Sequence, residues 1–109
     1  MLIKVLDGLS VSQIIIVPGQ ESVVDQSGTI ASTNVSQSLL SANLLRSGWV
    51  MQNCGVAAMY VNNTGDASTG LGSFKVTAGS FFPPAGFPVT TAAVSIAGTA
   101  GDTYTVKEW

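Results

Sequence analysis

The residue types that perform most enzymatic chemistry are scarce in this chain of 109 residues. It has no histidine and one cysteine, Cys54, which excludes Ser-His-Asp catalysis, Cys-His catalysis and the usual zinc sites. The six carboxylates fall mostly in predicted loops. Two carboxylates facing each other across a cleft are what a glycosidase needs, so a small hydrolase stays open as an alternative. We predict a protein that is not an enzyme and that uses no metal or cofactor.

Two groups of residues offer binding chemistry instead. Asp66 and Asn63 lie in the glycine-containing stretch 62–72, where they could ligate calcium, although an Asx turn in a solvated loop is the favoured interpretation. Trp49 and Tyr60 would form a platform for stacking a sugar if both were exposed. Aromatic residues in strands are more often part of the core, and we favour that interpretation for this pair.

Arg46 and Trp109 are candidates for a contact between subunits. Arg46 is the only arginine of the chain, and a lone arginine in a weakly charged protein tends to have a dedicated carboxylate or carbonyl partner. We predict that it clamps a loop or a subunit contact. Trp109 follows a predicted strand, and we expect it either to pack against its own domain or to dock on a neighbouring subunit.

The low charge of the chain bears on its partners. Only 9% of the residues are charged, against about 25% in a typical soluble domain, while serine and threonine together number 23. A surface built from hydroxyls and amides is easily desolvated, which favours coverage by neighbouring proteins. The four cations are scattered, so we expect no nucleic-acid partner and no polybasic membrane patch. No apolar run approaches the roughly 20 residues that span a bilayer.

Short strands separated by turn residues must position these groups. We predict strands at Leu2–Leu6, Val11–Val17, Val35–Leu40, Ser73–Thr77 and Ser80–Phe82, and two hairpins. The first hairpin joins Trp49–Gln52 to Ala57–Val61 through Asn53-Cys54-Gly55, and the second joins Ala92–Ala97 to Thr103–Glu108. Many strands without intervening helices indicate an all-β, antiparallel, jelly-roll-like sandwich.

A weak boundary near Thr33 divides this single domain into a segment or arm, residues 1–33, and a sandwich core, residues 34–109. The arm contains Ile14, Ile15 and Ile16, which we expect to be buried on both faces or covered by a neighbouring subunit.

Part of the chain also resembles a known class of proteins. The similar stretches are Val35–Arg46, Trp49–Asn53, Met59–Val61, Val76–Ser80, Val94–Ala100 and Val106–Trp109. Within them, an Ala42-Asn43 connector leads to Arg46, and an apolar strand then ends in Gln52-Asn53. This pattern resembles small virion proteins of tailed bacteriophages, and it covers residues 34–109. The resemblance implies a β-sandwich or jelly-roll module that decorates or cements a capsid, or that forms part of a head or tail fibre.

Together, these observations predict a structural virion protein that decorates and stabilises a bacteriophage capsid through subunit contacts. The expected partners are the major capsid protein or other virion proteins and further copies of the chain, with a trimer favoured. The expected location is the virion, after assembly in the cytoplasm of the bacterial host. The expected interface residues are Ile14, Ile15, Ile16, Arg46 and Trp109. The alternative is a head or tail fibre, or a carbohydrate- or receptor-binding module.

Overall fold

Nine strands make up the regular structure of residues 22–109, the part of the chain that the computed structural model describes. They are β1 (Val24–Asp25), β2 (Gly28–Thr29), β3 (Gln37–Leu40), β4 (Trp49–Asn53), β5 (Met59–Asn62), β6 (Phe74–Val76), β7 (Phe81–Phe82), β8 (Val94–Ala97) and β9 (Thr103–Glu108). Within these residues no helix is long and apolar enough to cross a membrane. The strands predicted at Leu2–Leu6 and Val11–Val17, with Ile14, Ile15 and Ile16, lie outside the described residues.

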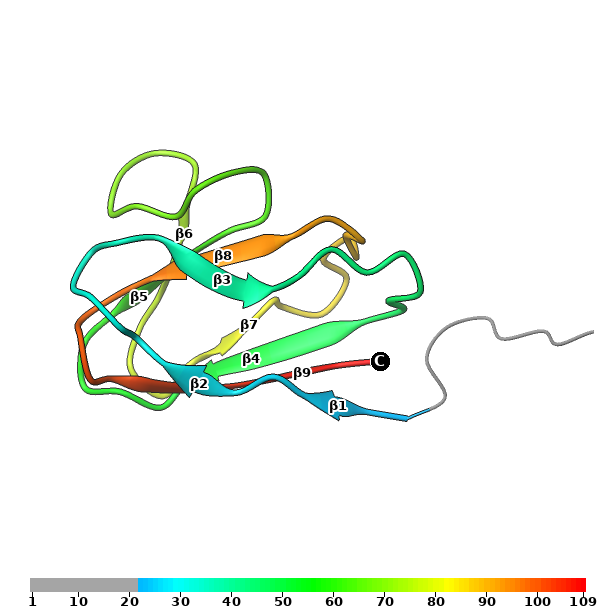
Figure 1. Ribbon diagram of the computed structural model, residues 1–109, viewed down its shortest axis with the longest axis horizontal. Coiled ribbons are helices and arrows are strands. Elements are labelled where there is room, and N and C mark those ends of the chain that lie inside the picture. Colours follow the sequence, from blue (N-terminus) through cyan, green and yellow to red (C-terminus); the bar gives the residue numbers. More distant parts are fainter. Residues whose placement is uncertain (1–21) are drawn as a thin grey trace, which may run out of the picture.

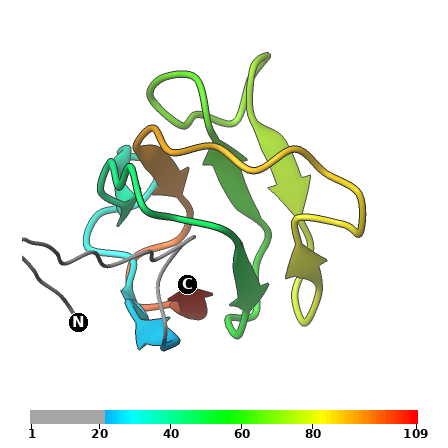
Figure 2. The same cartoon turned by 90° about the vertical axis from the view of Figure 1, so that its right-hand side faces the viewer.

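The strands form two antiparallel sheets that pack face to face (Figure 1). The first sheet has the order β1-β9-β4-β7, with β2 also paired to β9, and the second has the order β3-β8-β5-β6. The chain changes sheet at every connection between described strands except β1–β2 and β5–β6. Because β1 and β2 share the edge beside β9, each sheet is four strands wide. Two four-stranded sheets linked in this way form a jelly roll. The predicted all-β, jelly-roll-like sandwich is therefore confirmed, and Figure 2 shows the two layers from one end.

Both predicted hairpins are wrong, because each pair of consecutive strands divides between the two sheets. β4 pairs with β9 and β7, whereas β5 pairs with β8 and β6. The buried Asn53 side chain lies at the first crossing, where its Nδ2 donates to the carbonyls of Ala57, at 2.8 Å, and Val76, at 2.9 Å. Val76 belongs to the second sheet, so this amide links the end of β4 to the opposite layer. β8 and β9 are separated in the same way.

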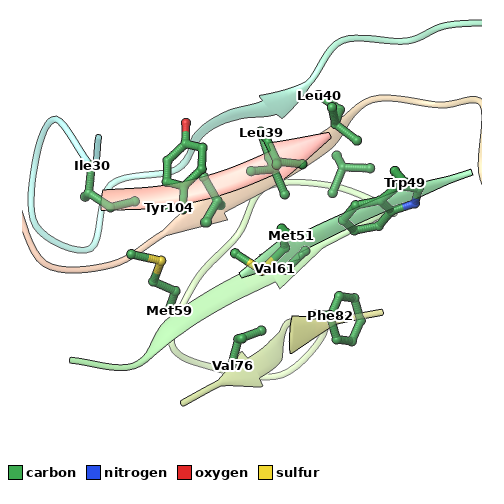
Figure 3. Close-up of a cluster of buried hydrophobic side chains, with 13 residues drawn as sticks. Ile30, Leu39, Leu40, Trp49, Met51, Met59, Val61, Val76, Phe82 and Tyr104 are labelled. Carbon is green, nitrogen blue, oxygen red and sulfur yellow. The ribbon is translucent and has the colours of Figure 1, made fainter. Parts of the chain in front are cut away.

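The core lies between the sheets and follows the predicted alternation of side chains. Trp49 and Met51 are buried while Val50 and Gln52 are partly exposed, and Met59 and Val61 are buried on the facing sheet. Figure 3 shows these side chains meeting between the layers. The full cluster comprises Ile30, Leu39, Leu40, Trp49, Met51, Met59, Val61, Val76, Phe82, Val94, Ile96, Tyr104 and Val106. Burial on one face of each strand accounts for the period of two in the sequence.

Residues 22–33 supply one edge of the first sheet. Val24 and Asp25 pair with Glu108 and Lys107 of β9, and β2 pairs farther along the same strand. Ile30 then enters the core. The described part of the predicted segment 1–33 is therefore bound to the sandwich along β9.

The two ends of the sandwich carry different loops. The start of β1, the start of β4, the end of β9 and the 41–48 loop share one end, at the right in Figure 1. The 83–93 loop reaches this end too, because the backbone N–H of Asn43 donates to the carbonyl of Thr91 at 2.8 Å. We call this end of the sandwich the clamp end.

Candidate functional site

Arg46 holds the clamp end together from inside the protein. It is only 4% exposed. Its Nε donates to Oε1 of Glu108 at 2.9 Å, and Nη1 donates to the carbonyls of Thr90, at 2.8 Å, and Ala92, at 3.0 Å. Nη2 donates to the carbonyl of Ser41. One guanidinium thus joins the 41–48 loop, the 83–93 loop and β9, which agrees with the predicted dedicated partner and loop clamp.

The Glu108 carboxylate is the centre of the same network. It is 5% exposed, and it accepts hydrogen bonds from the side-chain amides of Asn43 at Oε1 and Gln26 at Oε2, both at 3.2 Å. Burial, the largest influence, raises the pKa of Glu108. The hydrogen bonds from Arg46, Asn43 and Gln26, with the positive charge of Arg46, outweigh burial and leave the pKa below its usual value.

This lowered pKa makes a testable prediction. Because the folded pKa of Glu108 lies below the unfolded one, the folded chain binds fewer protons, so its stabilisation is lost as pH falls below about 4.5. We expect Glu108→Gln to be less stable near neutrality and to lose less further stability in acid. Urea unfolding at about pH 6 and about pH 3 measures the difference on either side of the glutamate pKa.

Asp25→Asn is the comparison variant. The exposed Asp25 carboxylate accepts hydrogen bonds from the hydroxyl and backbone N–H of Ser27, which lower its pKa as well. Solvent screens such an exposed group, so this variant should flatten the pH dependence less than Glu108→Gln does. Equal slopes in wild type and Glu108→Gln would contradict the prediction.

The clamp fixes a pair of leucines on the outside. Within the 41–48 loop, Oδ1 of Asn43 accepts a hydrogen bond from the N–H of Leu45 at 3.0 Å, and its carbonyl accepts one from the N–H of Arg46 at 3.1 Å. Leu44 and Leu45 are 88% and 59% exposed on this hydrogen-bonded loop. We call these two residues the leucine pair. Single exposed leucines are ordinary, but adjacent ones on a braced loop form a preorganised apolar contact.

Trp109 packs on its own chain at this end. Its backbone N–H donates to the carbonyl of Gly48 at 3.0 Å, and its carbonyl accepts hydrogen bonds from the N–H groups of Ser47 and Gly48. The indole lies so close to Gly48 that a Cβ atom there would stand 2.6 Å from the ring, which is why glycine is needed. Trp109 as a whole remains 37% exposed beside the 41–48 loop.

The predicted interface residues thus have different surroundings. Arg46 is inside the protein, Trp109 is partly exposed, and Ile14, Ile15 and Ile16 lie outside the described residues. Sequence reasoning did not single out Leu44 and Leu45, which are exposed on the 41–48 loop. The local sequence carries no signal for their exposure, because the consecutive Leu39 and Leu40 of β3 are both buried.

The sugar platform of Trp49 and Tyr60 is wrong, and the assignment of Trp49 to the core is confirmed. Trp49 is 4% exposed and packs on Phe82, with ring centroids 6.0 Å apart. Tyr60 belongs to the other sheet. Residues 22–109 also hold no group of three or more carboxylate or cysteine side chains able to bind a metal ion. The Asx turn expected for Asp66 is found at Asn62 instead, whose Oδ1 accepts a hydrogen bond from the N–H of Thr64 at 2.8 Å.

Comparison of the chain with protein-family models, with curated proteins and with solved structures gives no match.

Proposed function

We propose that this chain is a structural virion protein that decorates and stabilises a bacteriophage capsid through contacts between protein subunits. The observation that carries the proposal is the leucine pair, held outward by the buried Arg46–Glu108 network. The resemblance of residues 34–109 to small virion proteins of tailed phages supplies the biological setting. The jelly roll is compatible with it, although the same fold also serves lectins and cupins.

The physical chemistry of the clamp end favours a protein partner. Burying a leucine side chain fully is worth about 1.5–3 kcal/mol, and a braced loop loses little conformational freedom on binding. The single charged pair of the network is already buried and satisfied inside the chain, so docking does not strip it of water. The partner that fits is an apolar depression on a major capsid protein or on another virion protein.

Assembly with further copies of the chain is part of the proposal, with a trimer favoured. Val24, in the first described strand, pairs with Glu108 at the clamp end, and Ile14, Ile15 and Ile16 precede it in the sequence. Apolar strand-forming residues are an aggregation hazard unless something pairs with them. We expect the arm to contact a neighbouring subunit or the capsid there.

The proposal predicts that Leu44→Ser/Leu45→Ser abolishes capsid binding without unfolding the protein. Both leucines are expected to be buried in the complex with the capsid. Removing them therefore weakens the complex by at least about 3 kcal/mol, or roughly 100-fold in the dissociation constant. Both side chains are exposed in the free chain, so unfolding midpoints should change little. Binding is measured by co-sedimentation of purified protein with capsids of the phage that encodes it, and light scattering gives the mass of the free protein.

Val56→Ser is the matched control, because Val56 is exposed but lies in the connection between β4 and β5, away from the clamp end. It should bind capsids as the wild type does. The proposal fails if wild-type protein does not sediment with capsids, or if the leucine variant sediments equally well.

A further inference from the structure

A second surface, which meets the clamp end at Ala92, is hollowed. Three segments, residues 36–38, 63–66 and 92–95, line a depression of about 500 Å³. Its floor includes Ser38 and Ser95, which pair across β3 and β8 and alternate with the inward-facing core residues Leu39, Val94 and Ile96. The hollow therefore lies on the outer face of the second sheet, beneath the loop that joins β5 to β6, which stands above β8 in Figure 1. Its size is within the range of small-molecule sites.

Hydrogen bonds hold the wall of the hollow in place. The Ser95 hydroxyl donates to the carbonyl of Gly65, and the N–H of Ala67 donates to the Ser36 hydroxyl at 3.0 Å. Inside the loop, Nδ2 of Asn62 donates to the carbonyl of Asp66 at 3.0 Å. The loop is thus attached to both β8 and the residues preceding β3. A wall attached at several points keeps its shape when a ligand arrives, which lowers the entropic cost of binding.

The lining has hydrogen-bonding capacity that the protein itself leaves unused. A hydroxyl can donate once and accept twice, so Ser36 keeps its donor and Ser95 keeps acceptor capacity after the bonds just described. The Ser38 hydroxyl and the Asp66 carboxylate make no side-chain hydrogen bond within residues 22–109. Asp66 contributes the only formal charge among the lining residues.

This composition selects one class of ligand. The lining has no lysine or arginine, which disfavours phosphates and other anions, and no aromatic residue, which disfavours planar rings. A single carboxylate is also a poor calcium site, since calcium takes six to eight oxygen ligands. Hydroxyls, two side-chain amides and one carboxylate beside Ala92 and Ala93 suit a neutral molecule that presents many hydroxyl groups and some C–H surface. We propose that this hollow binds a neutral saccharide, with two adjacent sugar hydroxyls donating to the Asp66 carboxylate.

The hollow and the clamp end share the 83–93 loop, because Ala92 lines the hollow and its carbonyl accepts a hydrogen bond from Arg46. The two proposals are tested by different substitutions, at Leu44 and Leu45 for capsid binding and at Asp66 and Ser38 for the hollow. Saccharide binding is tested on the full chain by saturation-transfer NMR with glucose, galactose, mannose, rhamnose and N-acetylglucosamine, each titrated alone. We expect at least one of these sugars to bind saturably. Asp66→Asn should weaken the binding of that sugar at least tenfold, because an amide offers one acceptor oxygen in place of two. Ser38→Ala should weaken it less.

Asp25→Asn, which removes another exposed carboxylate on a different sheet, serves as the control and should leave binding unchanged. Asp66 is exposed, so its substitution leaves the unfolding midpoint close to that of the wild type. The inference is overturned if none of the five sugars binds saturably, or if Asp66→Asn and wild type bind equally. It is also overturned if binding disappears when a chelator removes calcium.

Discussion

Replacing Arg46 with methionine is expected to lower the free energy of unfolding by about 3–5 kcal/mol, one of the largest effects of any single substitution in this chain. Methionine keeps much of the buried aliphatic volume but removes the charge and every donor. The Glu108 carboxylate is then left buried without its cation, and the carbonyls of Ser41, Thr90 and Ala92 lose their donor. A buried ion whose partner is removed costs more than the pair contributed, because it keeps its desolvation penalty.

Urea unfolding followed by tryptophan fluorescence measures this loss of stability. Three further variants show which property of Arg46 causes it. Lys75→Met removes an exposed cation and should cost no more than about 0.5 kcal/mol. Arg46→Lys keeps the charge but not the planar group that reaches four acceptors, so it should rescue only part of the loss. Arg46→Met/Glu108→Leu removes both charges. Its loss in free energy of unfolding should be smaller than the sum of the losses of Arg46→Met and Glu108→Leu alone. A loss below about 1 kcal/mol for Arg46→Met would contradict the clamp.

Much of the fold could be predicted because strands bury one face. The alternation at Trp49–Gln52 and at Thr103–Glu108 identifies the inward-facing side chains, and the buried residues of β4 and β9 agree with it. The alternation does not identify the neighbouring strand, because a period of two is the same in a hairpin and in a crossing between sheets. Local turn chemistry suggested a hairpin at Asn53-Cys54-Gly55, since asparagine and glycine favour tight turns.

The candidate sites, too, could be predicted only in part from the sequence. A dedicated partner for Arg46 could be expected from composition, but Glu108, 62 residues away in sequence, could not be named. The exposure of Leu44 depends on how the 41–48 loop is braced from the 83–93 loop, which is a tertiary contact. The hollow depends on hydrogen bonds between residues about 30 positions apart, such as Ser36 with Ala67. Local patterns do not contain such pairings.

Substitution of Asn53 is expected to have the second large effect on the free energy of unfolding. It also tests why the predicted hairpin does not form. Its buried side chain donates to the carbonyls of Ala57 and Val76, and its Oδ1 accepts a hydrogen bond from the N–H of Gly55 at 2.8 Å. Asn53→Ala removes all three bonds and leaves buried backbone groups without partners. Since each such group costs about 1–3 kcal/mol, we expect the free energy of unfolding to fall by about 2–4 kcal/mol.

Asn53→Asp separates hydrogen bonding from packing. It keeps the shape of the side chain and the acceptor for Gly55, but it places an oxygen against the two carbonyls that now receive N–H groups. We therefore expect it to be at least as destabilising as Asn53→Ala in urea unfolding. Gln52→Ala, which removes one exposed bond to the carbonyl of Gly79, should cost no more than about 0.5 kcal/mol. If Asn53→Asp is as stable as the wild type, the amide does not direct the chain from one sheet to the other, and the crossing must arise from core packing alone.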